Sequence, residues 1–305
     1  MSTDATPRPA GSLDGPSAPA ISTDPIPVVA GPRRRPGASF FVGAAIVGVV
    51  VLMALVSFAW TPHDPTFVDA SARLRPIGDP VYLLGTDKLG RDVLSQVLVG
   101  ARTTLFVGLV AVGVAGLVGV PLGIVAAMAP RLLGEPLMRG IDLLLAFPAL
   151  LLAIMFSAVY GGSTLVAMIA IGIASVPSFV RLVRSGALQV LSTEYVMAAR
   201  AAGRGPWAIG LRHVLPNVSG LVIVQASVSF AIAVLAEAAL SFLGFGTPPP
   251  TPSWGRMLQE SQELLFAAPR LAVVPGIAIA LAVLGFNLLG DGLRDHYDPR
   301  MEDRR

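Results

Sequence analysis

The sequence has no cysteine, a single lysine and three histidines among its 305 residues. Without cysteine the chain forms no disulfide, thiolate metal site or iron–sulfur cluster, and it has no thiol nucleophile. None of the histidines lies inside an apolar run, so an intramembrane haem site and a histidine proton relay lack their usual parts. The net charge is +3 and the basic residues are scattered, which argues against nucleic-acid binding.

Charged residues are also scarce, at 13% of the chain, whereas 54% of residues are hydrophobic. A soluble domain carries about 25% charged residues, so this chain cannot cover a water-facing surface. About 20 apolar residues span a bilayer, and runs near that length lie at 38–60, 104–129, 141–160, 163–180, 219–245 and 271–290. The pattern predicts an all-α polytopic membrane protein with six transmembrane helices.

The remaining segments divide the chain. Residues 1–36 are rich in proline and have no apolar period, which predicts a disordered tail. After this tail we expect four parts: a first transmembrane helix at 37–60, an extracytoplasmic segment at 61–100, a core at 101–290 and a second tail at 291–305. With six spans, most arginines lie in segments on the same side of the membrane as the N-terminus. The positive-inside rule therefore places both termini in the cytoplasm. The run at 38–60 is too long for a cleaved signal peptide.

The longest inner connection, residues 191–217, has helix signals of its own. Thr193 can cap a helix that begins at Glu194, and Gly203 fits its end. A second short helix starts at Pro206, and Pro216 marks the turn toward the membrane. The first helix carries small side chains that allow close approach of another protein, at Ala198, Ala199, Ala201 and Ala202. A docking helix and an amphipathic linker on the inner leaflet explain these features equally well.

A family resemblance favours docking. The order of the residues resembles the EAA loop of ABC-importer permeases, in the YVxAARAxG…HxLPN form of peptide and nickel uptake systems; the matching positions are Glu194, Ala198, Ala199, Gly203, Leu215 and Pro216. The resemblance implies a type I ABC importer permease fold in the bacterial cytoplasmic membrane. It also implies that this loop inserts into a cytoplasmic ATPase as a coupling helix.

The same resemblance implies several partners, namely a second homologous permease subunit, two ABC ATPase subunits, an extracytoplasmic substrate-binding protein and membrane lipid. A P-loop requires GxxxxGK[ST], but the only lysine, Lys88, is followed by leucine. We therefore expect a non-catalytic subunit that binds no cofactor, with ATP and magnesium used by the partner ATPases.

Two further blocks fit the family. LGTDKLGRDVLSQVLVGARTTL, residues 84–105, resembles LGTDxxGRDxxSRxxxGARxSL. In it Asp87, Arg91 and Asp92 stand beside glycine turns and predict a local ion-pair network, which we interpret as a structured loop in preference to a substrate clamp. EAALSFLGFGTPPPTPSWG, residues 237–255, resembles EAxLSFLGxG…PxxSWG. An intramembrane carboxylate such as Glu237 is costly, so it either lines the transport pathway or makes a hydrogen bond between helices.

Two charged blocks predict interfacial anchors. Arg139 and Asp142, followed by Pro148, resemble the family's RxxD…P pattern, which suggests an ion pair at the membrane surface. The segment LGFNLLGDGLRDHYDPR resembles the C-terminal GDxLRDxxDPR signature through Asp291 and Arg294. Both are interpreted as structural, and no metal site is predicted.

The likeness is greatest to the C-type subunit of dipeptide and oligopeptide permeases, with nickel or another small solute as the alternative substrate. An ion-coupled secondary transporter would need inverted repeats and acidic or histidine relays near the midplane, and neither is evident. An intramembrane hydrolase would need a nucleophile and a base within hydrogen-bond reach, and no membrane histidine is available.

Overall fold

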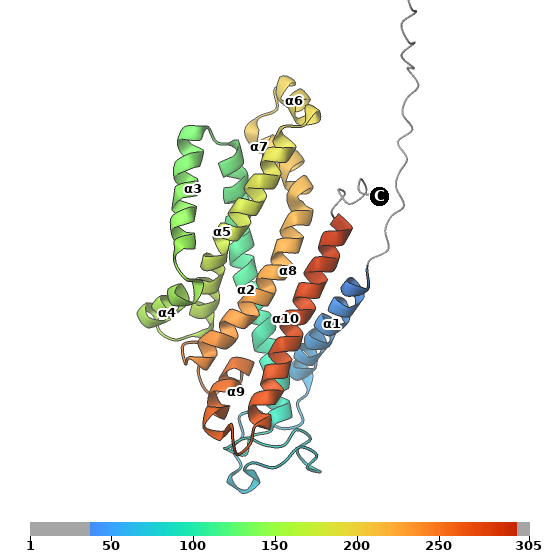
Figure 1. Ribbon diagram of the computed structural model, residues 1–305, viewed down its shortest axis with the longest axis vertical. Helices are drawn as coiled ribbons and strands as arrows, with labels where there is room; N and C mark the ends of the chain where they lie inside the picture. Colours follow the sequence, from blue (N-terminus) through green and yellow to red (C-terminus); the bar gives the residue numbers. More distant parts are fainter. Residues whose placement is uncertain (1–36, 298–305) are drawn as a thin grey trace, which may run out of the picture. The chain divides into compact units, whose positions relative to one another are not determined.

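A computed structural model describes residues 37–297. The regular structure of this part is helical, with one isolated bridge between Thr86 and Asp92, and it confirms the expected all-α class (Figure 1). The predicted tail at 1–36 and the last eight residues of the predicted 291–305 tail lie outside the described residues.

Five helices are long and apolar enough to cross a membrane: α1 (Ala38–Ala59), α2 (Val93–Met128), α5 (Thr164–Leu191), α8 (Leu215–Phe242) and α10 (Arg270–Tyr297). Several of them exceed the expected runs: α5 continues past residue 180 to Leu191, and α8 begins before residue 219. α2 begins before residue 104 because Asp92 caps it, accepting hydrogen bonds from the amides of Leu94 and Ser95. α10 continues past residue 290 to Tyr297. Apolar runs locate such helices, but the polar caps set where they end.

The expected single helix at 141–160 is wrong. The chain there forms α3 (Arg131–Ala146) and α4 (Ala149–Tyr160), which meet at an angle of 83°. Phe147 at the break is extended, with φ −79° and ψ 130°, because a residue before proline avoids the helical region, and here Pro148 follows. The number of spans is therefore five, or six if this bent pair counts as one.

The short elements are η1 (Ala70–Ala72), α6 (Glu194–Ala201), α7 (Pro206–Ile209), the π-helical η2 (Gly210–Val214), α9 (Trp254–Ser261) and η3 (Gln262–Leu264). The helical path from Pro206 through η2 to Phe242 is continuous, so Pro216 does not mark a turn as expected. Proline donates no hydrogen bond and crowds the carbonyl four residues earlier. The wider π turn directly before α8 accommodates both effects.

Small residues let the long helices approach closely. A Cβ added to Gly119 of α2 would lie 2.5 Å from Phe179 Cβ of α5, and one added to Gly123 would lie 2.8 Å from Val183 Cβ. A Cβ added to Gly43 of α1 would lie 2.4 Å from the backbone nitrogen of Leu289 in α10. Such contacts are typical of helices that associate by van der Waals packing within a membrane.

The bundle has two distinct ends in the described part of the chain. α6 lies at one end and α9, with the segment 61–92, lies at the other (Figure 1). We call these the α6 end and the α9 end. The beginning of α1 and the end of α10 both point toward the α6 end. Two separate hydrophobic clusters support the ends, one around Trp254 and Leu271 and the other around Phe179 and Val214.

Candidate functional site

Helix α6 has one side chain fully buried in the bundle, and its Tyr195 ring lies 5.9 Å from the His213 ring of η2, centre to centre. Val196 is 0% exposed and is the only buried residue of the helix. It packs in the cluster formed by α2, α5 and the α7–α8 segment, whose members include Val183, Ile209, Val214 and Val218. The rest of the helix surface is open, with Met197 52% exposed and Ala198, Arg200 and Ala201 also exposed. The helix therefore offers most of its surface to solvent or to another protein.

The end of α6 is a Schellman motif. The amide of Gly203 donates to the Arg200 carbonyl at 2.9 Å, and the amide of Arg204 donates to the Ala199 carbonyl at 3.1 Å. Gly203 has φ +76°, the left-handed conformation that glycine adopts at such positions without a Cβ penalty. The expected helix end at Gly203 is confirmed, and the chain reverses there into α7.

Other details of this loop differ from expectation. Thr193 precedes α6, but its hydroxyl donates to the Val190 carbonyl at 2.6 Å and does not cap the helix. Ala199 is half-buried, whereas Ala198 is exposed. Leu215 packs against the Val196 cluster, and Pro216 is exposed. Glu194 is exposed in the first turn of α6, at the positive end of the helix dipole.

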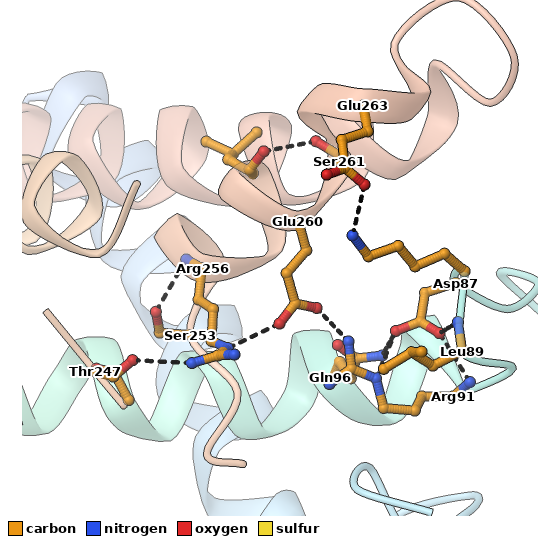
Figure 2. A network of polar contacts seen from close by, with 12 residues as sticks. Asp87, Leu89, Arg91, Gln96, Thr247, Ser253, Arg256, Glu260, Ser261 and Glu263 are labelled. Carbon is orange, nitrogen blue, oxygen red and sulfur yellow. Dashed lines mark hydrogen bonds and ion pairs between the residues drawn. The ribbon is translucent and has the colours of Figure 1, made fainter. Parts of the chain in front are cut away.

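A charged network lies at the α9 end, and Figure 2 shows its members. Arg91 Nε donates to Asp87 Oδ2 at 2.6 Å, and the same oxygen accepts a hydrogen bond from Gln96 Nε2 at 3.0 Å. Asp87 Oδ1 accepts from the backbone amides of Leu89, at 2.8 Å, and Arg91, at 2.9 Å. The predicted Asp87–Arg91 pair is present, and it closes the glycine turn that precedes α2.

The network continues onto α9, which the sequence did not predict. Arg91 Nη2 also pairs with Glu260 Oε2, whose second oxygen accepts from Arg256 Nε at 2.8 Å. The side chain of Arg91 is only 9% exposed. Burial opposes its charge, but attraction by Asp87 and Glu260 outweighs burial and raises the pKa of Arg91 above its ordinary value. The cation therefore ties the loop before α2 to α9.

Asp92 is not part of that network. Its carboxylate caps α2, accepts from the Ser95 hydroxyl at 2.6 Å, and lies 3.3 Å from His63 Nδ1. Trp254 gives α9 a second attachment, because its indole Nε1 donates to the Val97 carbonyl at 3.0 Å. The segment 61–92, α2 and α9 are thus joined by separate polar contacts.

Glu237 is enclosed within the protein. Its side chain is 2% exposed, and Oε1 accepts from the Ser241 hydroxyl at 2.6 Å and the Thr247 hydroxyl at 3.2 Å. The bond from Ser241 lies within α8, and the bond from Thr247 connects α8 to the loop that follows it. Neither bond joins two helices, so a hydrogen bond between helices and a place on the transport pathway both stay predictions.

The other charged residues predicted as interfacial anchors lie in α3 and on the last turns of α10. Asp142 pairs with Arg181 of α5, Nη2 to Oδ1, at 2.5 Å. The expectation that Arg139 and Asp142 form the ion pair is therefore wrong: Arg139 is exposed, and the packing of α3 against α5 presents Arg181 to the carboxylate. Asp291 and Arg294 are both exposed on the last turns of α10.

Sequence reasoning missed Arg256, Glu260 and Arg181. The pair of Arg256 and Glu260 could have been predicted, because an arginine and a glutamate four residues apart lie on the same side of a helix. No local pattern links either residue to Arg91, which is 169 positions from Glu260.

Comparisons with known proteins identify the family of the chain. The family described as "Binding-protein-dependent transport system inner membrane component" matches residues 119–303, a range that includes both α6 and α9. The chain belongs to this family. It is therefore an inner membrane permease component of a binding-protein-dependent transport system, which confirms the resemblance found in the sequence.

Similar proteins cover nearly all of this permease. The di/tripeptide transport system permease protein of Pseudomonas aeruginosa is 40% identical over 93% of this chain and 97% of its own length. The dipeptide transport system permease protein of Alkalihalophilus pseudofirmus is 41% identical over 86% of each chain. The glutathione transport system permease protein of Pectobacterium atrosepticum is 38% identical over 85% of this chain and 87% of its own.

Proposed function

We propose that this permease is a subunit of an ATP-driven importer that carries short peptides across the inner membrane. The names of its relatives support this substrate class, since di/tripeptide, dipeptide and glutathione permeases align with 85% or more of the chain. Its partners are a second homologous permease, two ABC ATPase subunits and an extracytoplasmic substrate-binding protein. The ATPases use ATP and magnesium, and this chain itself is not catalytic.

The observation that carries the proposal is the exposed helix α6, which has one fully buried side chain. Small side chains let another protein's backbone approach α6 closely. Because Val196 is the one fully buried side chain of the helix, a displacement of α6 is transmitted to the cluster around Val196. That cluster contains side chains of α2, α5 and α8, which pack as three long helices. We infer that α6 docks on an ATPase subunit, so that closure of the ATPases on nucleotide moves these three helices together.

The proposed orientation follows from the same placement. The α6 end lies in the cytoplasm, with both termini, and it carries the exposed cations Arg200, Arg204 and Arg212 that the positive-inside rule expects there. The α9 end then faces outward, where the binding protein delivers the peptide.

Docking is tested by cross-linking, which the absence of native cysteine makes specific for this subunit. The variant Ala198→Cys, in the complex purified from its own membranes, should form a cross-link to an ATPase subunit through a short bifunctional reagent. The matched control Ala267→Cys is an exposed alanine near the α9 end, and it should give no such product. Equal cross-linking from both positions, or none from Ala198→Cys, would overturn the docking proposal.

The substrate class is tested by uptake. Cells with the intact permease should accumulate a labelled dipeptide, and Ala198→Trp should abolish uptake while leaving the chain in the membrane. Ala198→Ser is the small control and should transport normally. Uptake of nickel without uptake of any di- or tripeptide would contradict the peptide assignment and leave the docking result unaffected.

A further inference from the structure

An apolar groove opens on the side of the bundle between α1 and α2. The groove has a volume of about 460 Å³ and lies beside the last turns of α1. Its walls are apolar, formed mainly by Val51, Leu55, Phe58, Leu105, Phe106 and Leu109. Leu55 and Leu109 are 61% and 68% exposed, so the groove faces the surroundings of the bundle and not its interior.

One charged side chain lies in this groove. Arg102 of α2 donates from Nε to the Ser57 hydroxyl at 3.2 Å and from Nη2 to the Ser57 carbonyl. Its guanidinium carbon lies 3.9 Å from the centre of the Phe58 ring. These contacts fix the guanidinium at the head of the groove, beside the end of α1.

The charge of Arg102 has no counter-charge in residues 37–297. Both hydrogen-bond acceptors belong to Ser57 and are neutral, and no carboxylate of the described residues lies within 4.0 Å of the guanidinium. Nη1 makes no hydrogen bond within this range either. A cation within a membrane-spanning helix is costly unless an anion or water accompanies it.

We propose that this groove binds an anionic phospholipid, with its phosphate on Arg102 and an acyl chain along the apolar wall. A guanidinium presents parallel N–H donors that match phosphate oxygens, and Nη1 is available for this contact. The exposed leucine and phenylalanine side chains provide the surface that an acyl chain covers. The site is separate from α6 and does not depend on the transported substrate.

The charge argues for lipid over a helix of a second permease in this position. An apolar helix would cover the groove but would bring no anion to Arg102, whereas an anionic phospholipid satisfies both the wall and the guanidinium. Because the last turn of α1 lies at the α9 end, the proposed orientation places this lipid in the outer leaflet.

The test uses the whole complex, purified in mild detergent and placed in nanodiscs of equal phosphatidylglycerol and phosphatidylcholine. Lipid that stays bound on re-extraction is then counted by mass spectrometry. Arg102→Gln should lower the ratio of bound phosphatidylglycerol to phosphatidylcholine about tenfold, the loss expected for a charge-assisted hydrogen bond. The control Arg73→Gln removes an exposed arginine of the outer segment and should leave the ratio unchanged.

A second variant keeps the test decisive if Arg102→Gln does not assemble. Leu109→Trp fills the groove from an exposed position while leaving Arg102 in place, and it should reduce bound phosphatidylglycerol as well. Unchanged lipid in both variants overturns the proposal. So does a loss of the second permease from Arg102→Gln at unchanged lipid content, because the groove would then be a subunit interface.

Discussion

Replacing Arg91 by glutamine tests whether the network at the α9 end holds that end together. Removing one partner of a buried ion pair costs about 3–5 kcal/mol, because the other charge stays buried. Here Asp87 keeps its bond from Gln96, and Glu260 keeps its bond from Arg256. We therefore expect a cost below that range, about 2–3 kcal/mol.

The assay is thermal unfolding of the detergent-purified protein, followed by tryptophan fluorescence. Trp254 is a suitable reporter, because it lies buried on α9 and its indole is hydrogen-bonded to α2. For a domain of this size, about 1 kcal/mol shifts the midpoint by roughly 2–4 °C. Arg91→Gln should thus lower the midpoint by roughly 4–12 °C.

The matched control is Lys88→Gln, three residues away. Its ammonium bonds Glu263 at 2.9 Å, but that carboxylate is 77% exposed, so the pair contributes about 0–1 kcal/mol. In a Glu260→Gln background the cost of Arg91→Gln should shrink, because one buried carboxylate is already neutral. Equal midpoints for Arg91→Gln and Lys88→Gln would refute the reasoning.

Three further predictions concern single positions. Gly203→Ala places a Cβ in a left-handed conformation, so α6 should lose about 1 kcal/mol and its amides should exchange hydrogen faster. Gly255→Ala builds a Cβ 2.4 Å from the Ala238 carbonyl oxygen, and the unfolding midpoint should fall by the equivalent of about 1–3 kcal/mol. Hydrogen bonds from Ser71 hold the pKa of Asp69 below its ordinary value of 3.8. The stability of the 69–72 turn is therefore present above pH 3.8 and lost as the pH falls through the folded-state pKa, and pepsin cleavage there should rise accordingly.

Controls for these predictions exist in the same chain. Gly162→Ala changes a loop glycine with open space and no positive φ, and α6 exchange should not respond to it. Gly276→Ala adds a methyl group to open space on α10, and it should not lower the midpoint. For the acid effect, Asp69→Asn should remove the pH dependence of cleavage. Faster α6 exchange in Gly162→Ala, or a midpoint as low in Gly276→Ala as in Gly255→Ala, would contradict the stated causes.

Local sequence was sufficient where local energetics decide the structure. A run of apolar residues must leave water and satisfy its own backbone, so the long helices could be located from hydropathy alone. The end of α6 was equally predictable, because glycine is the residue that closes a helix in the left-handed conformation. The break between α3 and α4 was missed although Pro148 was visible. The average hydropathy of a window carries no information about the direction of the helix axis.

Only the tertiary structure decided which polar groups meet. Glu260 reaches Arg91 across 169 positions, and Arg181 reaches Asp142 across 39. The burial of Glu237 likewise depends on how the loop after α8 folds back over that helix. The sequence determined that these residues are costly inside or beside a membrane and must find partners. It did not determine the partners, because helix packing brings together side chains that no local pattern connects.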